Sequence, residues 1–311
     1  MPADTISNDV GLIRAGIAYR KRLDLLFGLL GIAALALGML TIAALFTDMM
    51  IDGWQRLRPE FFTNFPSRRP AGAGILSAWV GSLLVMVVTA AMAVPLGVAA
   101  GIWLEEYAPK HWITDVVEIN INNLAGVPSI IYGLLALGLF VYTFHLGQTV
   151  RTAGLTLALL ILPMVIVATR EAIRSIPQMI REGAYALGAT KWQTVQHHIL
   201  PYSMPGILTG VIIGMARAIG ETAPIVTIGA LTFIAFLPPA PISETLPYIN
   251  FEWLKAPFTV MPIQIFSWTS RPEAAFQQNA AAAGAVLVAM TLAMNGLAIW
   301  LRYRLRKNIN W

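Results

Sequence analysis

Long stretches of the chain carry no charged residue, and short polar segments separate them. Six of these runs are long enough to cross the hydrocarbon core of a bilayer, which takes about 17 to 25 helical residues at roughly 1.5 Å each. The runs cover residues 25–47, 70–104, 119–150, 152–169, 222–243 and 274–301. Because a bilayer offers no water to hydrogen-bond backbone groups, such runs must form helices. The pattern therefore predicts an all-α membrane protein.

Two apolar stretches are longer than one simple span needs: 70–104, and 204–236 if its two charges are included. Pro95 interrupts the first stretch and Pro224 the second. Each stretch is therefore either one kinked span or a span followed by a short re-entrant piece. The distribution of Lys and Arg favours about six transmembrane helices with both termini in the cytoplasm, because an extra span would place fewer positive charges inside.

Composition supports the same class of protein. The chain has 311 residues, of which 57% are hydrophobic and 12% charged, against about 25% charged in ordinary soluble domains. The first run exceeds the roughly 7 to 15 apolar residues of a signal peptide, so we expect it to remain as a span. The absence of cysteine excludes disulfides and thiolate metal sites. The net charge of +5 comes from residues that flank apolar runs, which argues against nucleic-acid binding.

These patterns divide the chain into four parts. We expect a cytoplasmic N-terminal segment at 1–24, a first transmembrane helix at 25–47, a main transmembrane domain at 70–301 and a cytoplasmic tail at 302–311. The main domain contains one long polar loop, at about 171–202, between the fourth and fifth spans. Its place between these spans puts the loop on the cytoplasmic side.

The centre of this loop reads "EGAYALGATKWQTVQHHILP", residues 182–201. Good helix formers extend from about Arg174 to Gly188, and glycine readily takes the positive φ that ends a helix. Within that helix, apolar residues recur at steps of three and four, at Ile176, Ile180, Ala184 and Leu187. A second short helix is expected from Lys191 to Pro201. An amphipathic helix of this kind either rests on the lipid surface or packs against a protein partner.

Six residues of the loop stand in a particular arrangement. They are Glu182, Gly183, Ala184, Gly188, Leu200 and Pro201. The arrangement resembles the EAA loop in the membrane subunits of ABC importers, although Gly183 stands where a second alanine is usual and His198 where isoleucine is usual. The resemblance implies a type I ABC importer permease architecture (MetI-like) for residues 70–301. It also implies that a short coupling helix docks into a groove on a cytoplasmic ATPase.

Motifs for catalysis are missing from the chain. A P-loop needs a glycine-rich loop that ends in Gly-Lys-Ser/Thr after a strand, and the segment from Gly183 to Gly188 has no lysine at that spacing. The metalloprotease pattern His-Glu-x-x-His and the hydrolase pattern Gly-x-Ser-x-Gly do not occur either. We therefore expect no catalytic residue, no metal and no cofactor bound by this chain, with ATP and Mg²⁺ used by the partner ATPase.

A second informative segment is "ARAIGETAPIV", residues 216–226, which places Arg217 and Glu221 inside an apolar stretch. A charge near the centre of a bilayer costs about 2.5 kcal/mol or more, so it needs a partner or a water-filled path. The spacing of four residues lets the two side chains pair on one face of a helix. Either the pair neutralises itself and pins one helix to its neighbours, or it lines the translocation pathway, where a guanidinium suits an oxyanion.

Three segments together resemble the permease subunits of bacterial phosphate-specific ABC importers. They are "NNLAGVPSIIYGLLALGLFV" at 122–141, "GATKWQT" at 188–194 and "ARAIGETAP" at 216–224, and the Gly-Glu-Thr-Ala-Pro form is closer to the PstA branch than to the PstC branch. The glycines and the proline of the first segment are typical of close helix packing and a bend. The resemblance covers roughly residues 70–302.

The same resemblance implies a set of partners and a location. The partners would be a second, PstC-like permease subunit, two PstB-like ATPase subunits and a periplasmic, PstS-like phosphate-binding protein, with phosphate as the cargo and lipid as the surroundings. The location would be the bacterial inner membrane, crossed several times, with both termini cytoplasmic. Permeases for other oxyanions have related loops, and a gradient-driven secondary transporter or channel for an oxyanion is the alternative class. An EAA loop distinguishes the classes, because only the importer needs an ATPase dock.

Overall fold

The computed structural model describes residues 3–242, 248 and 250–306, and each secondary-structure element in that part of the chain is a helix. Five single helices and one bent helix pair are long and apolar enough to cross a membrane. The prediction of an all-α membrane protein is therefore confirmed. The chain divides into two compact units, residues 1–52 and 53–311.

The first unit consists of the helix α1 (Ala3–Gly53). It contains the predicted first span, 25–47, and the apolar part that could cross a membrane begins at Tyr19. That part has a mean hydropathy of 2.4 and none of its most apolar window is buried. Leucine, isoleucine and alanine occupy all sides of the helix, which is the pattern of a membrane span rather than of a soluble amphipathic helix.

Two long helices form the centre of the second unit. The helix α3 (Leu76–Ile102) continues through a π-helical turn, η3 (Trp103–Tyr107), as one span that contains Pro95. The long run 70–104 is thus a single span. The helix α6 (Val150–Arg174) packs along α3, and glycines allow the close approach, since a methyl group at Gly154 would overlap Val88.

The helices α3 and α6 run in the same direction. Thr89 of α3 donates a hydrogen bond to the carbonyl oxygen of Gly154 in α6 at 3.3 Å. Further along both helices, Gly101 lies against Thr169, and Glu105 accepts a hydrogen bond from Arg174 at the end of α6. The residue numbers of the contacting residues therefore increase in both helices from one end to the other, as they do in parallel helices. The segment between them must bring the chain back across the membrane.

That returning segment is a broken span. It consists of α4 (Trp112–Leu124), α5 (Ser129–Ala136) and the π-helical η4 (Leu137–Thr143). The two halves meet at 106°, and Pro128 stands at the start of α5. The run 119–150 was expected as one span with a bend at its glycines and proline, and the observed break lies at the glycine and proline at 126 and 128. Counting this pair as one span gives the predicted six.

The fifth span differs from the prediction. After α7 (Gln178–Ala186), the helix α8 (Lys191–Thr194), the π-helical η5 (Val195–Ile199) and α9 (Leu200–Gly220) form one continuous span. The run 222–243 is not a span, because only α10 (Ala223–Thr227) is helical in its described part. Hydropathy alone overlooked the glycines and prolines that keep this segment out of a long helix. Of the two readings of 204–236, the structure has a span followed by a short separate piece.

The last part of the chain forms α11 (Met261–Thr269) and the long α12 (Ala274–Arg306). Short helices complete this unit: η1 (Trp54–Arg56), α2 (Pro59–Thr63), η2 (Pro70–Gly72) and η6 (Glu252–Lys255). Phe61 of α2 packs with the buried Trp268 and Phe276. The compact unit therefore includes residues before the predicted domain start at 70. The predicted tail continues α12 to 306, and its last five residues lie outside the described part.

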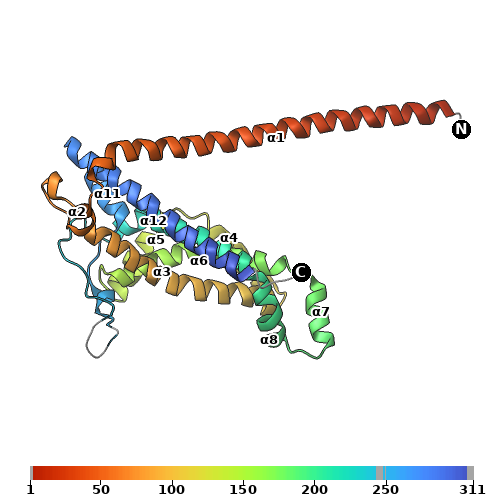
Figure 1. The fold of residues 1–311 in the computed structure, drawn as a ribbon. Helices are drawn as coiled ribbons and strands as arrows, with labels where there is room; N and C mark the ends of the chain where they lie inside the picture. Colours follow the sequence, from red (N-terminus) through yellow and green to blue (C-terminus); the bar gives the residue numbers. More distant parts are fainter. Residues whose placement is uncertain (1–2, 243–247, 249, 307–311) are drawn as a thin grey trace. The chain divides into compact units, whose positions relative to one another are not determined.

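The second unit has two ends that matter for function. Figure 1 shows α2 and α11 at one end of the bundle, and α7 and α8 at the other. We refer to these as the α11 end and the α7 end. The end of α3 and the end of α6 both lie at the α7 end, because Glu105 and Arg174 are in contact there. The predicted cytoplasmic loop is thus a distinct structural element at one end of the bundle.

Candidate functional site

The loop at the α7 end has the predicted order of helix, turn and helix. The helix α7 begins at Gln178 rather than at about Arg174, because α6 continues through Arg174 and Pro177 precedes the new helix. It ends at Ala186, and Gly188 has a φ of +81°. The predicted break at Gly188 is therefore confirmed, and it needs a residue that tolerates positive φ.

One side of α7 packs against the bundle and the other side is free in this chain. Ala184 is buried, and Ile176 and Ile180 join a small apolar cluster with residues of α6 and η5. Glu182 and Gly183 are exposed on the opposite side. Leu187 was expected on the packed side, but 91% of it is exposed because the helix has ended by that point. The exposed side of α7 is thus available to a partner.

The second helix of the loop starts with a capping box. The Thr190 hydroxyl oxygen accepts a hydrogen bond from the backbone N–H of Gln193 at 3.3 Å, and the Gln193 side chain accepts one from the N–H of Thr190 at 2.8 Å. This pairing satisfies backbone donors that a helix start leaves open. Leu200 and Pro201 lie where η5 passes into α9, so they belong to the continuous span. Pro201 is exposed and Leu200 half-buried.

Arg217 and Glu221 are paired, as their spacing predicted. The Arg217 Nε donates a hydrogen bond to Glu221 Oε1 at 3.1 Å. The two residues are not on one helix, because α9 ends at Gly220 and Glu221 has an extended backbone with ψ of 125°. The exposed fractions of the side chains are 35% for Arg217 and 18% for Glu221. Among the described residues, the two Nη atoms of Arg217 have no hydrogen-bonding partner.

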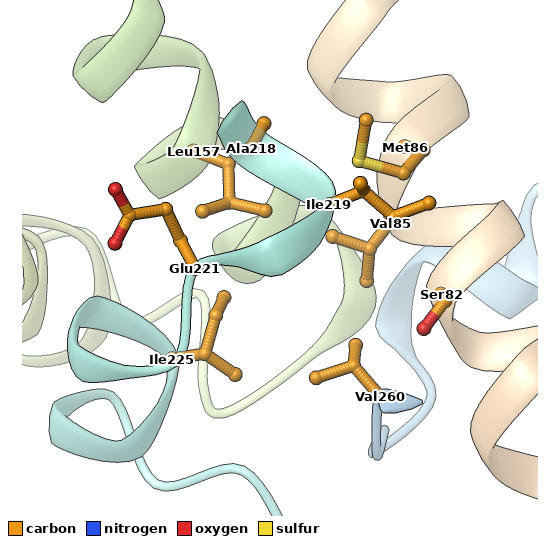
Figure 2. A pocket seen from close by; sticks show the side chains of 9 residues that line it. All are labelled: Ser82, Val85, Met86, Leu157, Ala218, Ile219, Glu221, Ile225 and Val260. Atoms are coloured by element: carbon orange, nitrogen blue, oxygen red, sulfur yellow. The ribbon is translucent and has the colours of Figure 1, made fainter. Parts of the chain in front are cut away.

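The end of α9 lies at a depth well inside the bundle. Glu221 and Ile219 line a small cavity with Leu157 of α6 and Met86 of α3, which Figure 2 shows from close by. Those two residues are roughly 10 to 15 Å along their helices from the α11 end, at about 1.5 Å per residue. The cavity leaves only ≈ 10 Å³ for the centre of a water molecule, enough for about one water and too small for a phosphate ion. The Glu221 carboxylate points away from Ile219 and Val85 (Figure 2).

The short α10 is held in place by close packing against α5. A methyl group at Gly133 of α5 would lie 2.6 Å from the Pro224 Cα, so only glycine permits this contact. The close packing predicted for Gly133 is thus observed, whereas Gly126 contributes to the bend without a tight neighbour. This packing fixes the backbone just after Glu221, and with it the direction of the carboxylate toward Arg217.

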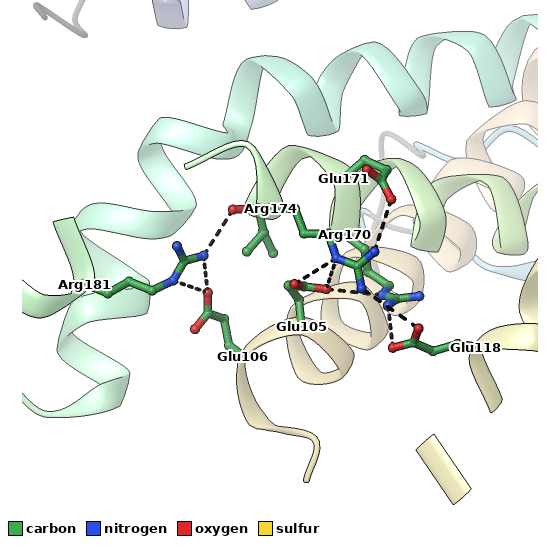
Figure 3. Close-up of polar contacts among 8 residues, drawn as sticks. Glu105, Glu106, Glu118, Arg170, Glu171, Arg174 and Arg181 are labelled. Carbon is green, nitrogen blue, oxygen red and sulfur yellow. Dashed lines mark hydrogen bonds and ion pairs between the residues drawn. The ribbon is translucent and has the colours of Figure 1, made fainter. Parts of the chain in front are cut away.

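Sequence reasoning missed a cluster of ion pairs at the α7 end. It joins acidic residues of η3, α4 and α6 to arginines of α6 and α7, as Figure 3 shows. Its members are Glu105, Glu106, Glu118, Arg170, Glu171, Arg174 and Arg181. The adjacent glutamates that directly follow the apolar run 70–104 were the available signal. Pairing them with the arginines requires knowing that α3 and α6 end side by side.

Comparison with known proteins gives consistent matches. The family model described as "Binding-protein-dependent transport system inner membrane component" matches residues 93–310. The probable ABC transporter permease protein YqgI of Bacillus subtilis (strain 168) is 31% identical over 287 residues, which covers 91% of this chain and 95% of the relative. The phosphate transport system permease protein PstA of Yersinia pestis is 32% identical over 290 residues, 90% of each chain.

A solved structure supports the same fold. An inward-facing conformation of the MetNI methionine ABC transporter matches with a TM-score of 0.56 and 16% sequence identity. The match covers 73% of this chain and 93% of the chain in that structure. This likeness concerns the arrangement of the helices, and it agrees with the predicted MetI-like architecture.

Proposed function

This chain belongs to the family of binding-protein-dependent transport system inner membrane components, and we propose that it is the PstA-type permease subunit of an ATP-driven phosphate importer. It is a permease subunit of an ABC importer and a multi-pass protein of the inner membrane. The substrate, the named partners and the residue roles below are parts of the proposal. One observation carries it: a short helix, α7, exposes Glu182 and Gly183 at one end of the bundle, just before the turn at Gly188.

The helix α7 is the proposed coupling helix. Its inward side is fixed by Ala184 and Ile180, so its outward side can enter a groove on an ATPase as a pre-formed helix. Gly188 leaves room for close approach of the partner's backbone, and Glu182 can accept hydrogen bonds from partner groups. Leu200 and Pro201 join the loop to α9, so that a displacement of the loop reaches the fifth span. In this assignment the α7 end is cytoplasmic.

Arg217 is the proposed contact for the transported anion. Glu221 occupies its Nε and leaves the two Nη atoms, which can donate parallel hydrogen bonds to two oxygens of one oxyanion. The carboxylate therefore orients the guanidinium without using all of its donors. The name of the Yersinia pestis relative supports phosphate as the anion. Because the cavity beside Glu221 holds about one water, the described conformation has no room for phosphate there.

The remaining parts of the importer come from partners. We propose a PstC-like second permease subunit, two PstB-like ATPases that bind ATP and Mg²⁺, and a PstS-like periplasmic phosphate-binding protein. This chain then contributes no ATP site, and both of its termini are cytoplasmic. ATP binding would bring the ATPases together and move α7, and the spans would open to the periplasm. After hydrolysis the pathway would open inward, and a weak contact at Arg217 would release phosphate quickly.

Phosphate uptake into proteoliposomes tests the proposal. The vesicles would hold this chain with its permease partner and ATPase, with binding protein on one side and ATP on the other. We expect uptake to need ATP, Gly188→Asp to release the ATPase from the complex, and Arg217→Ala to assemble normally but lose uptake. Gly138→Ala is a suitable control, because no atom lies within 4 Å of a methyl group added there.

The competing class makes the opposite prediction. Uptake that follows an ion gradient without ATP, with Gly188→Asp unchanged, would identify a secondary transporter or channel. Normal phosphate uptake in vesicles that hold the Arg217→Ala variant would show that the Arg217–Glu221 pair has only a structural role. Competition by molybdate, tungstate and sulfate in the same vesicles distinguishes phosphate from other oxyanions.

A further inference from the structure

One arginine of α7 connects three separate elements of the bundle. The Arg181 Nε and Nη2 donate hydrogen bonds to Glu106 Oε1 in η3, at 3.0 and 2.7 Å. Nη1 donates to the carbonyl oxygen of Ile176 at 2.9 Å, and Nη2 also donates to that of Ile173 at 3.1 Å. These carbonyls belong to the end of α6 and the turn after it, and that of Ile173 also accepts a hydrogen bond from the backbone N–H of Ile176 at 3.2 Å. The guanidinium therefore joins α7 to both α3 and α6.

This contact is well shielded from water. The exposed fraction of the side chain is 7% for Glu106 and 18% for Arg181. In contrast, the pair of Arg174 and Glu171 nearby is 47% and 66% exposed. Exposed ion pairs contribute little, because water and salt screen them, whereas removing one partner of a buried pair leaves an uncompensated charge. The Arg181–Glu106 pair is therefore the stronger mechanical connection of the two.

Besides this polar contact, α7 also lies against α8 and η5, the start of the fifth span. Its apolar attachment consists of the buried Ala184 and the half-buried Ile180, while Glu182 and Gly183 face outward. Arg181 is thus the polar attachment on the inward side, next in sequence to the residues that a partner would contact. A force applied to the outward side of α7 reaches α3 most directly through this guanidinium.

The rest of the ion-pair cluster stiffens the same region. Arg170 of α6, whose side chain is 5% exposed, contacts Glu105 of η3 at 3.5 Å and also pairs with Glu118 of α4. The adjacent Glu105 and Glu106 are therefore held by α6 and by α7, respectively (Figure 3). Because η3 directly continues α3, a displacement at Glu106 is passed to the whole span Leu76–Tyr107 rather than lost in a flexible loop.

We propose that Arg181 and Glu106 are a positioning pair that transmits the displacement of α7 to α3 and so keeps ATP hydrolysis coupled to transport. This inference rests on the proposed role of α7 as the coupling helix. The pair touches neither phosphate nor ATP. Its role is to make the end of α3 follow α7, so that the membrane path changes when the ATPase does.

The test measures phosphate taken up per ATP hydrolysed, in the reconstituted full complex. The variants are Arg181→Gln, Glu106→Gln and the double variant, with Arg181→Lys to keep the charge but lose the planar fork. We expect each single glutamine variant to lower the ratio about tenfold while hydrolysis continues. The double variant should be no worse than either single variant, as a double-mutant cycle requires of residues that act together. Arg181→Lys should recover part of the ratio.

The exposed Glu171 supplies a matched control. Glu171→Gln removes the same kind of charge as Glu106→Gln from a nearby side chain that is 66% exposed, and we expect it to change the ratio less than about twofold. Equal losses of uptake and hydrolysis in the Arg181 and Glu106 variants, or release of the ATPase by both glutamine variants, would overturn the inference, because the pair would then only maintain the fold. An unchanged ratio would also overturn it.

The design separates this inference from the proposed function. If Gly188→Asp fails to release the ATPase, the coupling-helix assignment itself is wrong. If Gly188→Asp releases the ATPase while Arg181→Gln and Glu106→Gln retain the wild-type ratio, the coupling helix stands and only the transmission through this pair fails.

Discussion

Two glycines in and after the proposed coupling helix, Gly183 and Gly188, differ in backbone conformation. Gly188 has a φ of +81°, a backbone conformation that costs other residues roughly 1 to 2 kcal/mol. Gly183 lies in α7, and no atom of this chain lies within 4 Å of a methyl group added there. Alanine substitutions at these two glycines can therefore distinguish the effect of backbone strain, at Gly188, from the effect of an added methyl group, at Gly183.

We therefore predict that Gly188→Ala lowers the affinity for the ATPase by about tenfold, since roughly 1.4 kcal/mol corresponds to that factor. Gly183→Ala should stay within about twofold, because alanine favours the helix and meets no atom of the chain. Titration of the purified ATPase against the membrane subunits in detergent measures both affinities. Equal losses in the two variants would show that close approach of the partner, rather than strain, decides the affinity.

Residue spacing predicted some contacts and missed others. The pairing of Arg217 with Glu221 followed from their separation, yet the end of α9 at Gly220 did not, because the sequence alone allowed a kinked helix. The role of Arg217 in transport stays a prediction. The Arg181–Glu106 contact joins residues far apart in sequence, and no local pattern could reveal it without the parallel arrangement of α3 and α6.

At the scale of elements, the seam between α3 and α6 depends on glycine. A methyl group at Gly154 would overlap Val88, and one at Gly97 would lie 2.7 Å from the Val165 side chain. Membrane helices gain little from the hydrophobic effect among lipid tails, so such close packing supplies much of their association. The seam is therefore sensitive to small increases in volume.

We predict that Gly154→Ala destabilises the subunit by about 1 to 3 kcal/mol, the usual cost of overpacking. The change should lower the midpoint of thermal unfolding in detergent relative to the wild-type chain. Gly138→Ala should leave the midpoint unchanged, because the space around that position is open in this chain. A midpoint that is the same for both variants would show that α3 separates easily from α6.

The sequence predicted some of the helices correctly and others wrongly, and each outcome has a physical reason. Absence of charge located α1, α3, α6 and α12, because a long apolar helix is the only common solution for such a run in a bilayer. The same criterion failed at 222–243, where backbone-breaking residues lie in an equally apolar segment whose residues 231–242 are mostly exposed in this chain. The fifth span instead begins in the polar loop at Lys191, and a search for charge-free runs misses this start because the first residues of the span are polar or charged.

At the scale of the whole molecule, the direction of the helices decides how often the chain crosses the membrane. Because α3 and α6 are parallel, the bent pair of α4 and α5 must cross between them. His111, just before this pair, and Thr143, its last residue, should then lie on opposite sides. The same reasoning puts Thr190 with His111, and Arg68 with Thr143.

The lack of cysteine in the chain makes this topology easy to test. Single cysteines at these four positions would react with a membrane-impermeant maleimide applied to intact spheroplasts or to inverted vesicles. We expect Arg68→Cys and Thr143→Cys to react in spheroplasts, and His111→Cys and Thr190→Cys in inverted vesicles. Reaction of His111→Cys and Thr143→Cys from the same side would show that the bent pair re-enters the membrane without crossing it.

The glycine seam also limits where this protein can change shape. Because α3 and α6 pack closely at glycines and their ends are joined by the ion pairs at Glu105, we expect them to move as one rigid body. Bending must then be confined to hinges where helical hydrogen bonding is already interrupted. Such places include residues 125–128, 175–177 and 221–222, which follow α4, α6 and α9. During transport, the broken third span and the end of α9 would thus move relative to α3 and α6, which would keep their arrangement.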